Sequence, residues 1–343
     1  VVGGERIVGR AAELERLDQA LAAACAGHGT TALIAGPAGI GKTRLLTECQ
    51  RRTGHSGTRW LWARCLEYEH HVPYAPVAQL LGEVLGLAQE AKSIDREHLS
   101  ARLGFADREQ ESAVVMGLSF VLRAESGSAD TSRPEGEQVQ KCIYQAAESV
   151  ISALLSEGPL AIVIDDLQWC DRASLDLFSH ILRRFSSSKL VLCASCRSHA
   201  VPQWEGLEDA HKTKLKGLSE KDSERLVFSI LDRADEYEAL STCRRVILDR
   251  CEGNPLFVEE MVKLLMDKGL LLREEGLWRI CGPPDEAQLP DSLRGMVMAR
   301  TDRLQEEERL LLQTLSVLGP DTSVEVLSKL AGGLDVDFTR AAV

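Results

Sequence analysis

The chain has 343 residues, of which 44% are hydrophobic and 27% charged, a length that allows two or three domains of ordinary size. Its formal net charge is -12, and a protein without a strong basic field is poorly suited to bind nucleic acid or an anionic membrane. No apolar run reaches the roughly 18 to 20 residues that span a bilayer, and the N-terminus lacks the basic and apolar stretches of a secretory signal. We therefore expect a cytoplasmic protein without membrane contact.

The first 125 residues predict a helix, a buried strand and a second helix, followed by further, mostly helical structure. Leu14, Leu17 and Leu21 recur at helical spacing, and a short apolar run then leads into a glycine-rich turn. The expected elements are a helix over residues 10–25, strands over 31–35 and 59–65, and helices after residue 42 and over 74–87. The polar stretch 125–137, rich in Gly, Ser and Pro, predicts a mobile surface loop inserted into the domain.

Apolar runs of strand length continue in the middle of the chain. The expected elements are helices over 139–150 and 173–184 and strands over 160–164 and 190–194. Strands that are apolar throughout and alternate with helices are typical of a parallel sheet covered on both faces. The sequence therefore predicts an α/β domain with a doubly wound parallel sheet over residues 1–217.

The sequence becomes helical in pattern after residue 217. Ser219 with Asp222 forms a capping box ahead of an apolar helical face. Two short runs, 270–273 and 277–280, flank Glu-Glu-Gly and predict a β-hairpin. Further helices are expected over 290–304, 306–317 and 324–330. We therefore expect a helical lid domain over 218–269 and a third unit over 270–343.

The strongest motif is the sequence GPAGIGKT, which begins at Gly36 and fits the pattern G-x-x-x-x-G-K-[ST] between a strand and a helix. Glycines let the backbone wrap closely around a triphosphate, and N–H groups at a helix N-terminus attract its charge. Lys42 is expected to reach the β- and γ-phosphates as part of the catalytic machinery, and the Thr43 hydroxyl to ligate Mg²⁺. The residues predicted here to bind ATP are Gly36, Pro37, Ala38, Gly39, Ile40, Gly41, Lys42, Thr43 and Arg44. The alternative is a glycine-rich turn with an exposed lysine.

Two adjacent carboxylates, Asp165 and Asp166, follow the apolar run 160–164. Ligands of a doubly wound sheet bind beyond the carboxyl ends of its strands, which places both side chains near the phosphates. We predict that Asp165 holds Mg²⁺ through its water shell. Asp166 is predicted to be catalytic, polarising the water that attacks the γ-phosphate. The alternative is a helix N-cap with an acidic first turn.

Arg197 is the third candidate, because it follows the apolar run 190–195 at the end of a predicted core strand. We predict that it acts in catalysis by contacting the γ-phosphate from the side; the alternative is an ordinary surface arginine. Cys193 and Cys196 form a C-x-x-C pair, but the sequence has no second pair at metal-finger spacing, and the first cysteine lies within the strand. We expect neither a zinc site nor a redox site there.

Four segments occur in the order seen in STAND-type ATPases, a branch related to AAA+ proteins. They are Ile7-Val8-Gly9-Arg10, the phosphate loop, the stretch IDDLQWCD from Ile164, and the stretch EGNPLFVEE from Glu252. More narrowly, the chain resembles the ATPase modules of soluble class III adenylyl cyclases, large ATP-binding transcription regulators and some Ser/Thr kinases. The resemblance runs from Ile7 to about Leu330. Gln168 and Cys170 depart from the pattern, since they stand where His and Ala are more frequent.

The resemblance implies that Val8, Gly9 and Arg10 lie against the adenine. It also implies that Pro255, in a Gly-Asn-Pro turn, contacts the nucleotide from the helical domain, although a helix stop with proline at a first helical position explains the same residues. The stretch 289–304 resembles the start of a winged-helix domain, which we expect to be truncated. Its arginines alternate with carboxylates, which disfavours direct nucleic-acid binding and favours a mechanical role.

We therefore predict an ATP-hydrolysing regulatory switch in which Mg-ATP or ADP sets the arrangement of the domains. Hydrolysis is expected to be slow or partner-stimulated, because no arginine finger is identifiable. One alternative is a nucleotide-binding scaffold with negligible hydrolysis that recruits a partner; another is a P-loop kinase, for which the sequence lacks a basic lid. The chain begins at Val1 without Met, and we interpret it as a fragment. Its partners are then the sensor and output domains of the same polypeptide, and oligomerisation stays open.

Overall fold

The structure is a computed structural model, and its described residues form two compact units. It describes residues 7–54, 57–86, 96–105, 107–123, 136–231, 241–274, 277–281, 289–290, 292–302, 304–318, 326 and 329. The first unit contains residues 5–217 and the second contains residues 218–343. None of the helices in the described ranges is long and apolar enough to cross a membrane.

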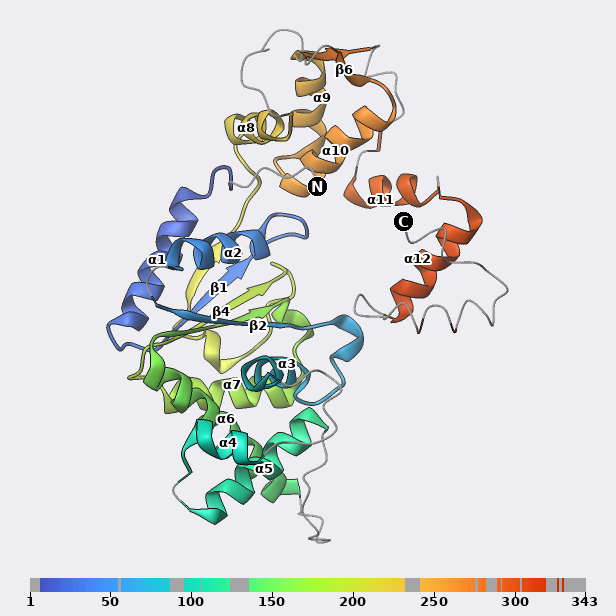
Figure 1. The fold of residues 1–343 in the computed structure, drawn as a ribbon. Coiled ribbons are helices and arrows are strands. Elements are labelled where there is room, and N and C mark those ends of the chain that lie inside the picture. The colour runs from blue at the N-terminus through green and yellow to red at the C-terminus, as the bar shows by residue number, and fades with distance from the viewer. Residues whose placement is uncertain are drawn as a thin grey trace. The chain divides into compact units, whose positions relative to one another are not determined.

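A parallel sheet of five strands forms the centre of the first unit, in the order β2-β3-β4-β1-β5 (Figure 1). The strands are β1 (Thr30–Ala35), β2 (Arg59–Arg64), β3 (Leu160–Asp165), β4 (Leu190–Cys196) and β5 (His211–Lys214). Every residue of β3 and β4 is buried, because helices cover both faces of the sheet. The predicted doubly wound α/β fold is thus confirmed, and the strand order reverses beside β1, where such sheets bind ligands.

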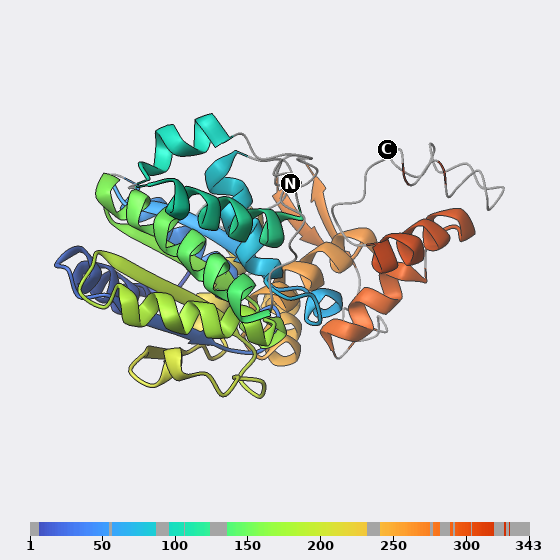
Figure 2. The same cartoon turned by 90° about the horizontal axis from the view of Figure 1, so that it is seen from below.

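The two faces of the sheet have separate hydrophobic cores. One face packs against α1 (Ala11–Cys25) and α2 (Lys42–Thr53), which contribute Leu14 and Leu45 among other buried residues. The other face packs against α3 (Ala75–Leu85), α6 (Gly136–Glu157) and α7 (Arg172–Arg184), while α4 (Arg96–Leu103) and α5 (Arg108–Leu122) pack on α6. In Figure 1, α1 and α2 lie above the sheet, and Figure 2 shows α6 and α7 across the opposite face.

The sequence prediction missed β5, whose residues are His-Lys-Thr-Lys. This strand pairs with β1 on one side only, and Thr213 is its one buried residue. An edge strand of this kind carries lysines into solvent and has no apolar run for a periodicity search to find. The other expected strands are present, whereas the polar stretch expected to be mobile falls largely outside the described residues, with α6 starting at Gly136.

The second unit begins with helices and a hairpin. Its elements are α8 (Glu220–Leu231), α9 (Ser241–Cys251), α10 (Pro255–Asp267), β6 (Leu271–Glu274), β7 (Leu277–Ile280), α11 (Leu293–Thr301) and α12 (Glu306–Leu318). Ser219 Oγ accepts a hydrogen bond from the Asp222 N–H at 3.1 Å, as the capping pattern predicts. The predicted hairpin is confirmed, because β6 and β7 pair antiparallel. Most of the helix expected over 324–330 lies outside the described residues, and the winged-helix fold stays a prediction.

An ion-pair cluster on α2 gives the first unit a pH-dependent stability. Glu48 accepts hydrogen bonds from Arg51 Nε at 2.8 Å and Arg52 Nε at 3.0 Å, and the Arg51 bond is the main reason why its pKa is lowered from 4.5 to about 2. A lowered pKa in the folded state adds stability above the ordinary pKa, and this stability is lost as pH falls toward the folded value. Because both arginines are largely exposed, we expect Glu48→Gln to cost only about 1 kcal/mol at pH 7.

The check is the urea-unfolding free energy of parent and Glu48→Gln between pH 7 and pH 2. The difference between the two proteins should shrink below pH 4.5, the ordinary value for this carboxyl, and nearly vanish close to pH 2. A difference that is the same at both ends of the range would contradict the assignment.

Candidate functional site

The three predicted motifs meet at one edge of the sheet, beyond the carboxyl ends of β1, β3 and β4. The parallel register pairs Ala35 of β1 with Cys196 of β4, and the Gly36 N–H donates to the Cys196 carbonyl at 3.1 Å. Asp165 ends β3, the strand on the other side of β4. The phosphate loop, the two carboxylates and Arg197 are therefore brought together by the strand order, as the sequence predicts.

The loop between β1 and α2 has the backbone that a phosphate cradle needs. Gly39 and Gly41 have φ values of 74° and 96°, a left-handed conformation that favours glycine. At Gly36 an added Cβ would lie 2.8 Å from Ile40 Cγ2, and Ile40 is itself buried beneath the loop. The loop ends at Lys42, where α2 begins, and the N-terminus of a helix favours a bound anion.

Lys42 is a buried cation whose hydrogen-bond partners among the described residues are neutral carbonyls. Its side chain donates from Nζ to the carbonyls of Gly36 at 3.3 Å and Pro37 at 3.0 Å, and the residue is 8% exposed. Within the described part of the chain it forms no ion pair. Burial of an ammonium without a counter-charge is unfavourable in free energy, so a bound anion would stabilise the loop.

Arg10 fastens the N-terminal segment to the phosphate loop. One guanidinium nitrogen donates to the Ile40 carbonyl and another to Glu13 Oε1, both at 3.2 Å. Gly9 and Arg10 both have positive φ, so the chain turns sharply just before α1. Arg10 thus contacts the loop directly, and the contact of Val8, Gly9 and Arg10 with adenine stays a prediction.

Asp165 and Thr43 provide a pair of oxygen ligands. Thr43 Oγ1 donates to Asp165 Oδ2 at 2.9 Å, and the other carboxylate oxygen, Oδ1, accepts from Ser195 Oγ. Asp165 is buried, at 6% exposure. A hydroxyl and a carboxylate side by side are hard oxygen donors that suit Mg²⁺, an ion that keeps several of its own waters and needs few protein ligands. The residues present therefore fit the predicted metal.

Asp166 is held in a left-handed conformation, with φ 58°. Its N–H donates to Ser195 Oγ at 3.1 Å, and its Oδ1 accepts from Gln168 Nε2 at 3.0 Å. The neighbouring helix α7 is capped by Asp171, whose Oδ1 accepts from the Ser174 N–H at 2.9 Å. The N-cap of α7 is thus a third acid, and of the adjacent pair at the end of β3 Asp165 contacts Thr43 of the phosphate-loop motif.

Arg197 lies beside the same network. Its N–H donates to Gln168 Oε1 at 3.1 Å, and its guanidinium carbon is 6.0 Å from the centroid of the Trp169 ring, within cation–π range. The sequence prediction did not single out Ser195 or assign a role to Gln168. A serine inside an otherwise apolar buried strand was the available signal for Ser195, whereas nothing in the spacing signals the partners of Gln168.

The buried Ser195 hydroxyl connects both carboxylate residues, since it donates to Asp165 and accepts from the Asp166 N–H. Ser195→Ala removes the donor to the buried Asp165 Oδ1 and the acceptor of the partly buried Asp166 N–H, and an unsatisfied buried polar group costs about 1–3 kcal/mol. We expect a lower urea midpoint in the absence of nucleotide. The matched control is Ser156→Ala on the exposed side of α6, which should change stability by about 0.5 kcal/mol or less. Equal midpoints for Ser195→Ala and the parent would contradict this role.

Two further predicted features have local explanations. Pro255 belongs to the second unit and is the first residue of α10, whose N-cap Asn254 accepts from the Phe257 N–H at 3.4 Å. Its contact with the nucleotide stays a prediction. Cys193 and Cys196 pack into the cores on opposite faces of the sheet, which separates the two thiols of the C-x-x-C pair.

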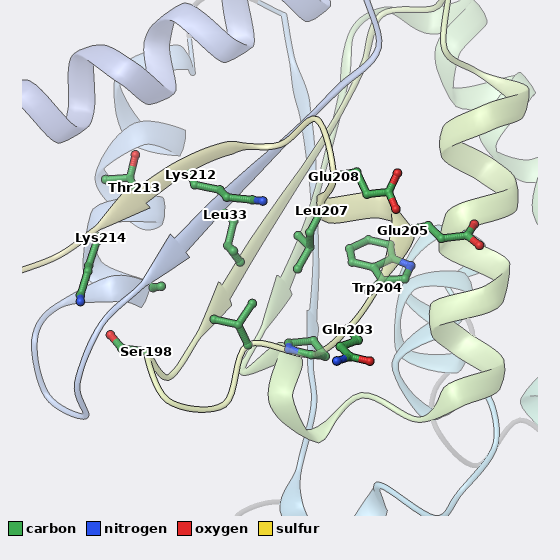
Figure 3. Close-up of a pocket in the computed structure, with 13 residues that line it drawn as sticks. Leu33, Ser198, Gln203, Trp204, Glu205, Leu207, Glu208, Lys212, Thr213 and Lys214 are labelled. Atoms are coloured by element: carbon green, nitrogen blue, oxygen red, sulfur yellow. The ribbon is translucent and has the colours of Figure 1, made fainter.

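A groove of about 640 Å³ lies between the segment 201–208 and the β5 edge of the sheet (Figure 3). Leu33 and Lys212, which are register partners, line it from the strands, and Trp204 and Leu207 line it from the other side. None of the residues that line it belongs to the phosphate loop or to the acidic pair. The groove therefore shares no residue with those two segments, although Ala35 and Ser198, which line it, directly adjoin Gly36 and Arg197 in the chain.

A known family matches the part of the chain that carries this site. The family model described as AAA ATPase domain covers residues 6–193, more than half of the 343 residues. An uncharacterized protein of Rhizobium meliloti (strain 1021) is 26% identical over 334 residues, which are 96% of this chain and 30% of that protein. The chain thus spans less than a third of the length of this curated relative.

Solved structures show weaker likeness. Drosophila ORC bound to DNA is 12% identical, with 98% of this chain and 77% of that chain covered and a TM-score of 0.45. The replication initiator DnaA bound to AMPPCP and single-stranded DNA is 14% identical, with 92% and 70% covered and a TM-score of 0.40. The Thermotoga maritima RuvB Holliday junction branch migration motor is 17% identical, with 96% and 83% covered and a TM-score of 0.40.

Because these TM-scores are below 0.5, we base the family on the match to residues 6–193. That match includes the phosphate loop and both adjacent carboxylates. The chain belongs to the AAA ATPase domain family.

Proposed function

We propose that this chain binds and hydrolyses ATP with Mg²⁺ and acts as a regulatory switch within a larger signalling protein. Membership of the AAA ATPase domain family makes it a nucleotide-binding ATPase module. The observation that carries the proposal is the buried Lys42 ammonium, which has no ion-pair partner among the described residues and lies in the loop next to the Thr43–Asp165 oxygen pair. A polyphosphate with its bound cation satisfies both features at once.

In this proposal each residue has a role that follows from its position in the site. Lys42 and the first N–H groups of α2 bind the phosphates, and Thr43 with Asp165 holds the cation. Mg²⁺, when bound with ATP, neutralises charge on the phosphates. Asp166 accepts a proton from the attacking water at Oδ2, and Arg197 stabilises negative charge on the γ-phosphoryl group. In this proposal Val8, Gly9 and Arg10 bind the adenine side.

Hydrolysis is tested by phosphate release from ATP in single-turnover conditions, with and without Mg²⁺. We expect slow, Mg²⁺-dependent release that needs no acceptor molecule. Binding of Mg-ATP without phosphate release would instead support the scaffold function, and release that depends on an added acceptor would support a phosphotransferase. Absence of Mg-ATP binding would overturn the proposal altogether.

The switch is a second part of the proposal. In it, the helical lid 218–269 and the winged-helix-like unit 270–343 change their arrangement with the nucleotide, as expected when one arrangement binds ATP better than ADP. Small-angle X-ray scattering of the chain with Mg-ADP, and with Mg-ATP under conditions without turnover, tests this. We expect different radii of gyration, and identical scattering curves in the two states would contradict the switch.

A further inference from the structure

Gln168 forms a bridge between two functional segments that are far apart in the sequence. Its Nε2 donates to Asp166 Oδ1 at 3.0 Å, and its Oε1 accepts from the Arg197 N–H at 3.1 Å. Both ends of one amide are thus used, one on the residue that follows β3 and the other on the residue that follows β4. In this way the side chain ties the loop after β3 to the loop after β4.

The bridge leaves one carboxylate oxygen of Asp166 available. Oδ1 is held by Gln168, while Oδ2 has no hydrogen-bond partner within the described ranges. The backbone of Asp166 is fixed independently, because its N–H donates to Ser195 Oγ at 3.1 Å and its carbonyl accepts from the Trp169 N–H at 2.9 Å. The only rotation left to the carboxylate is that of its own side chain, and the Gln168 amide restricts it.

The local turn does not need the Gln168 side chain. The short 3-10 turn Leu167–Trp169 is closed by backbone bonds, from the Trp169 N–H to the Asp166 carbonyl and from the Cys170 N–H to the Leu167 carbonyl at 3.0 Å. Leu167 is fully buried in the core and anchors the turn. A purely structural role for the amide is therefore limited to the modest contribution of one or two hydrogen bonds.

We infer that Gln168 is a positioning residue for ATP hydrolysis: it orients the Asp166 carboxylate toward the attacking water and couples that carboxylate to the Arg197 segment. This inference rests on the proposed function. Arg197 is predicted to contact the γ-phosphate, so any shift of its backbone on nucleotide binding is transmitted through one amide to the base. Loss of orientation of a base costs rate rather than affinity, and a misplacement of about 1 Å can cost 100-fold.

A double-mutant cycle tests the coupling. Gln168→Met keeps the length of the side chain but removes the amide, and it should lower the single-turnover rate about 10- to 100-fold while the Kd for Mg-ATP changes less than about 3-fold. In an Asp166→Asn background the same substitution should cause no further loss, because Gln168 acts through Asp166. Gln168→Glu keeps an acceptor for the Arg197 N–H but has no donor for Asp166. Its single-turnover rate should therefore fall by about as much as that of Gln168→Met.

The matched control is Gln50→Met on α2, which removes a hydrogen bond from Trp62 Nε1 at 3.0 Å and should leave the rate unchanged. Thermal unfolding of each variant separates loss of fold from loss of positioning. Parental rates in both Gln168 variants would overturn the inference, as would losses that multiply in the Asp166→Asn background or a parallel loss of Mg-ATP affinity. A parent that binds Mg-ATP but does not hydrolyse it would instead overturn the proposed hydrolysis, and the inference with it.

Discussion

Replacement of Lys42 by alanine is expected to weaken binding of Mg-ATP about 100-fold. The amine is buried in the phosphate loop and donates to the carbonyls of Gly36 and Pro37, with no ion pair in the part of the chain that the structure describes, so its positive charge is available to a phosphate. A hydrogen bond from a charged group is worth about 1.5–3 kcal/mol, and about 1.4 kcal/mol corresponds to tenfold in affinity. Since Lys42 is predicted to reach the β- and γ-phosphates, the loss should be large for ATP and small for AMP.

Isothermal titration calorimetry with Mg-ATP, Mg-ADP and AMP measures this dependence on phosphate number. Lys212→Ala is the matched control, because it removes the same charge from the exposed strand β5, where Lys212 lines the groove. If Lys42→Ala binds Mg-ATP as tightly as the parent, then the phosphate-loop assignment is wrong. An equal loss for AMP would point to a damaged fold rather than to a missing phosphate contact.

The parts of the fold that follow from local pattern could be predicted from the sequence. Apolar runs predict β1, β3 and β4, because these strands are covered on both faces and their interior residues are mostly apolar. Strand β5 could not be found in this way, since it is an edge strand and its one buried side chain is Thr213. The hairpin of the second unit was predictable because a turn sequence separates its two strands.

The candidate site likewise contains residues that the sequence predicts and residues that only the folded structure reveals. Gly36, Lys42 and Asp165 carry their chemistry in a fixed spacing next to a strand, so the sequence alone indicates them. Ser195 and Gln168 act through partners up to 30 residues away in the chain, which only the pairing of β3 with β4 brings into contact. Residues that position others have no spacing rule of their own, and the folded sheet is needed to find them.

Replacement of Asp166 by asparagine is expected to abolish most hydrolysis while leaving nucleotide binding intact, the reverse of the Lys42 result. Asparagine keeps the size of the side chain and an oxygen for the Gln168 Nε2–H, so the network around the residue can persist. It cannot accept a proton from water, and a general base contributes about 10²- to 10⁴-fold in rate. We expect a single-turnover rate lower by about that factor, with the Kd for Mg-ATP within about 3-fold of the parent.

Asp176→Asn supplies the control, since Asp176 is a partly exposed acid on α7 in an ion pair with Arg172 at 3.0 Å. The Asp176→Asn protein should hydrolyse ATP at the same rate as the parent. Asp165→Asn should behave differently again, because Asp165 lies 2.9 Å from Thr43 Oγ1 and is the proposed cation ligand. Its defect should appear as a higher Mg²⁺ concentration for half-maximal activity. Equal rates for Asp166→Asn and the parent would remove Asp166 from the mechanism and leave Asp165 as the only acid of the pair that acts in the reaction.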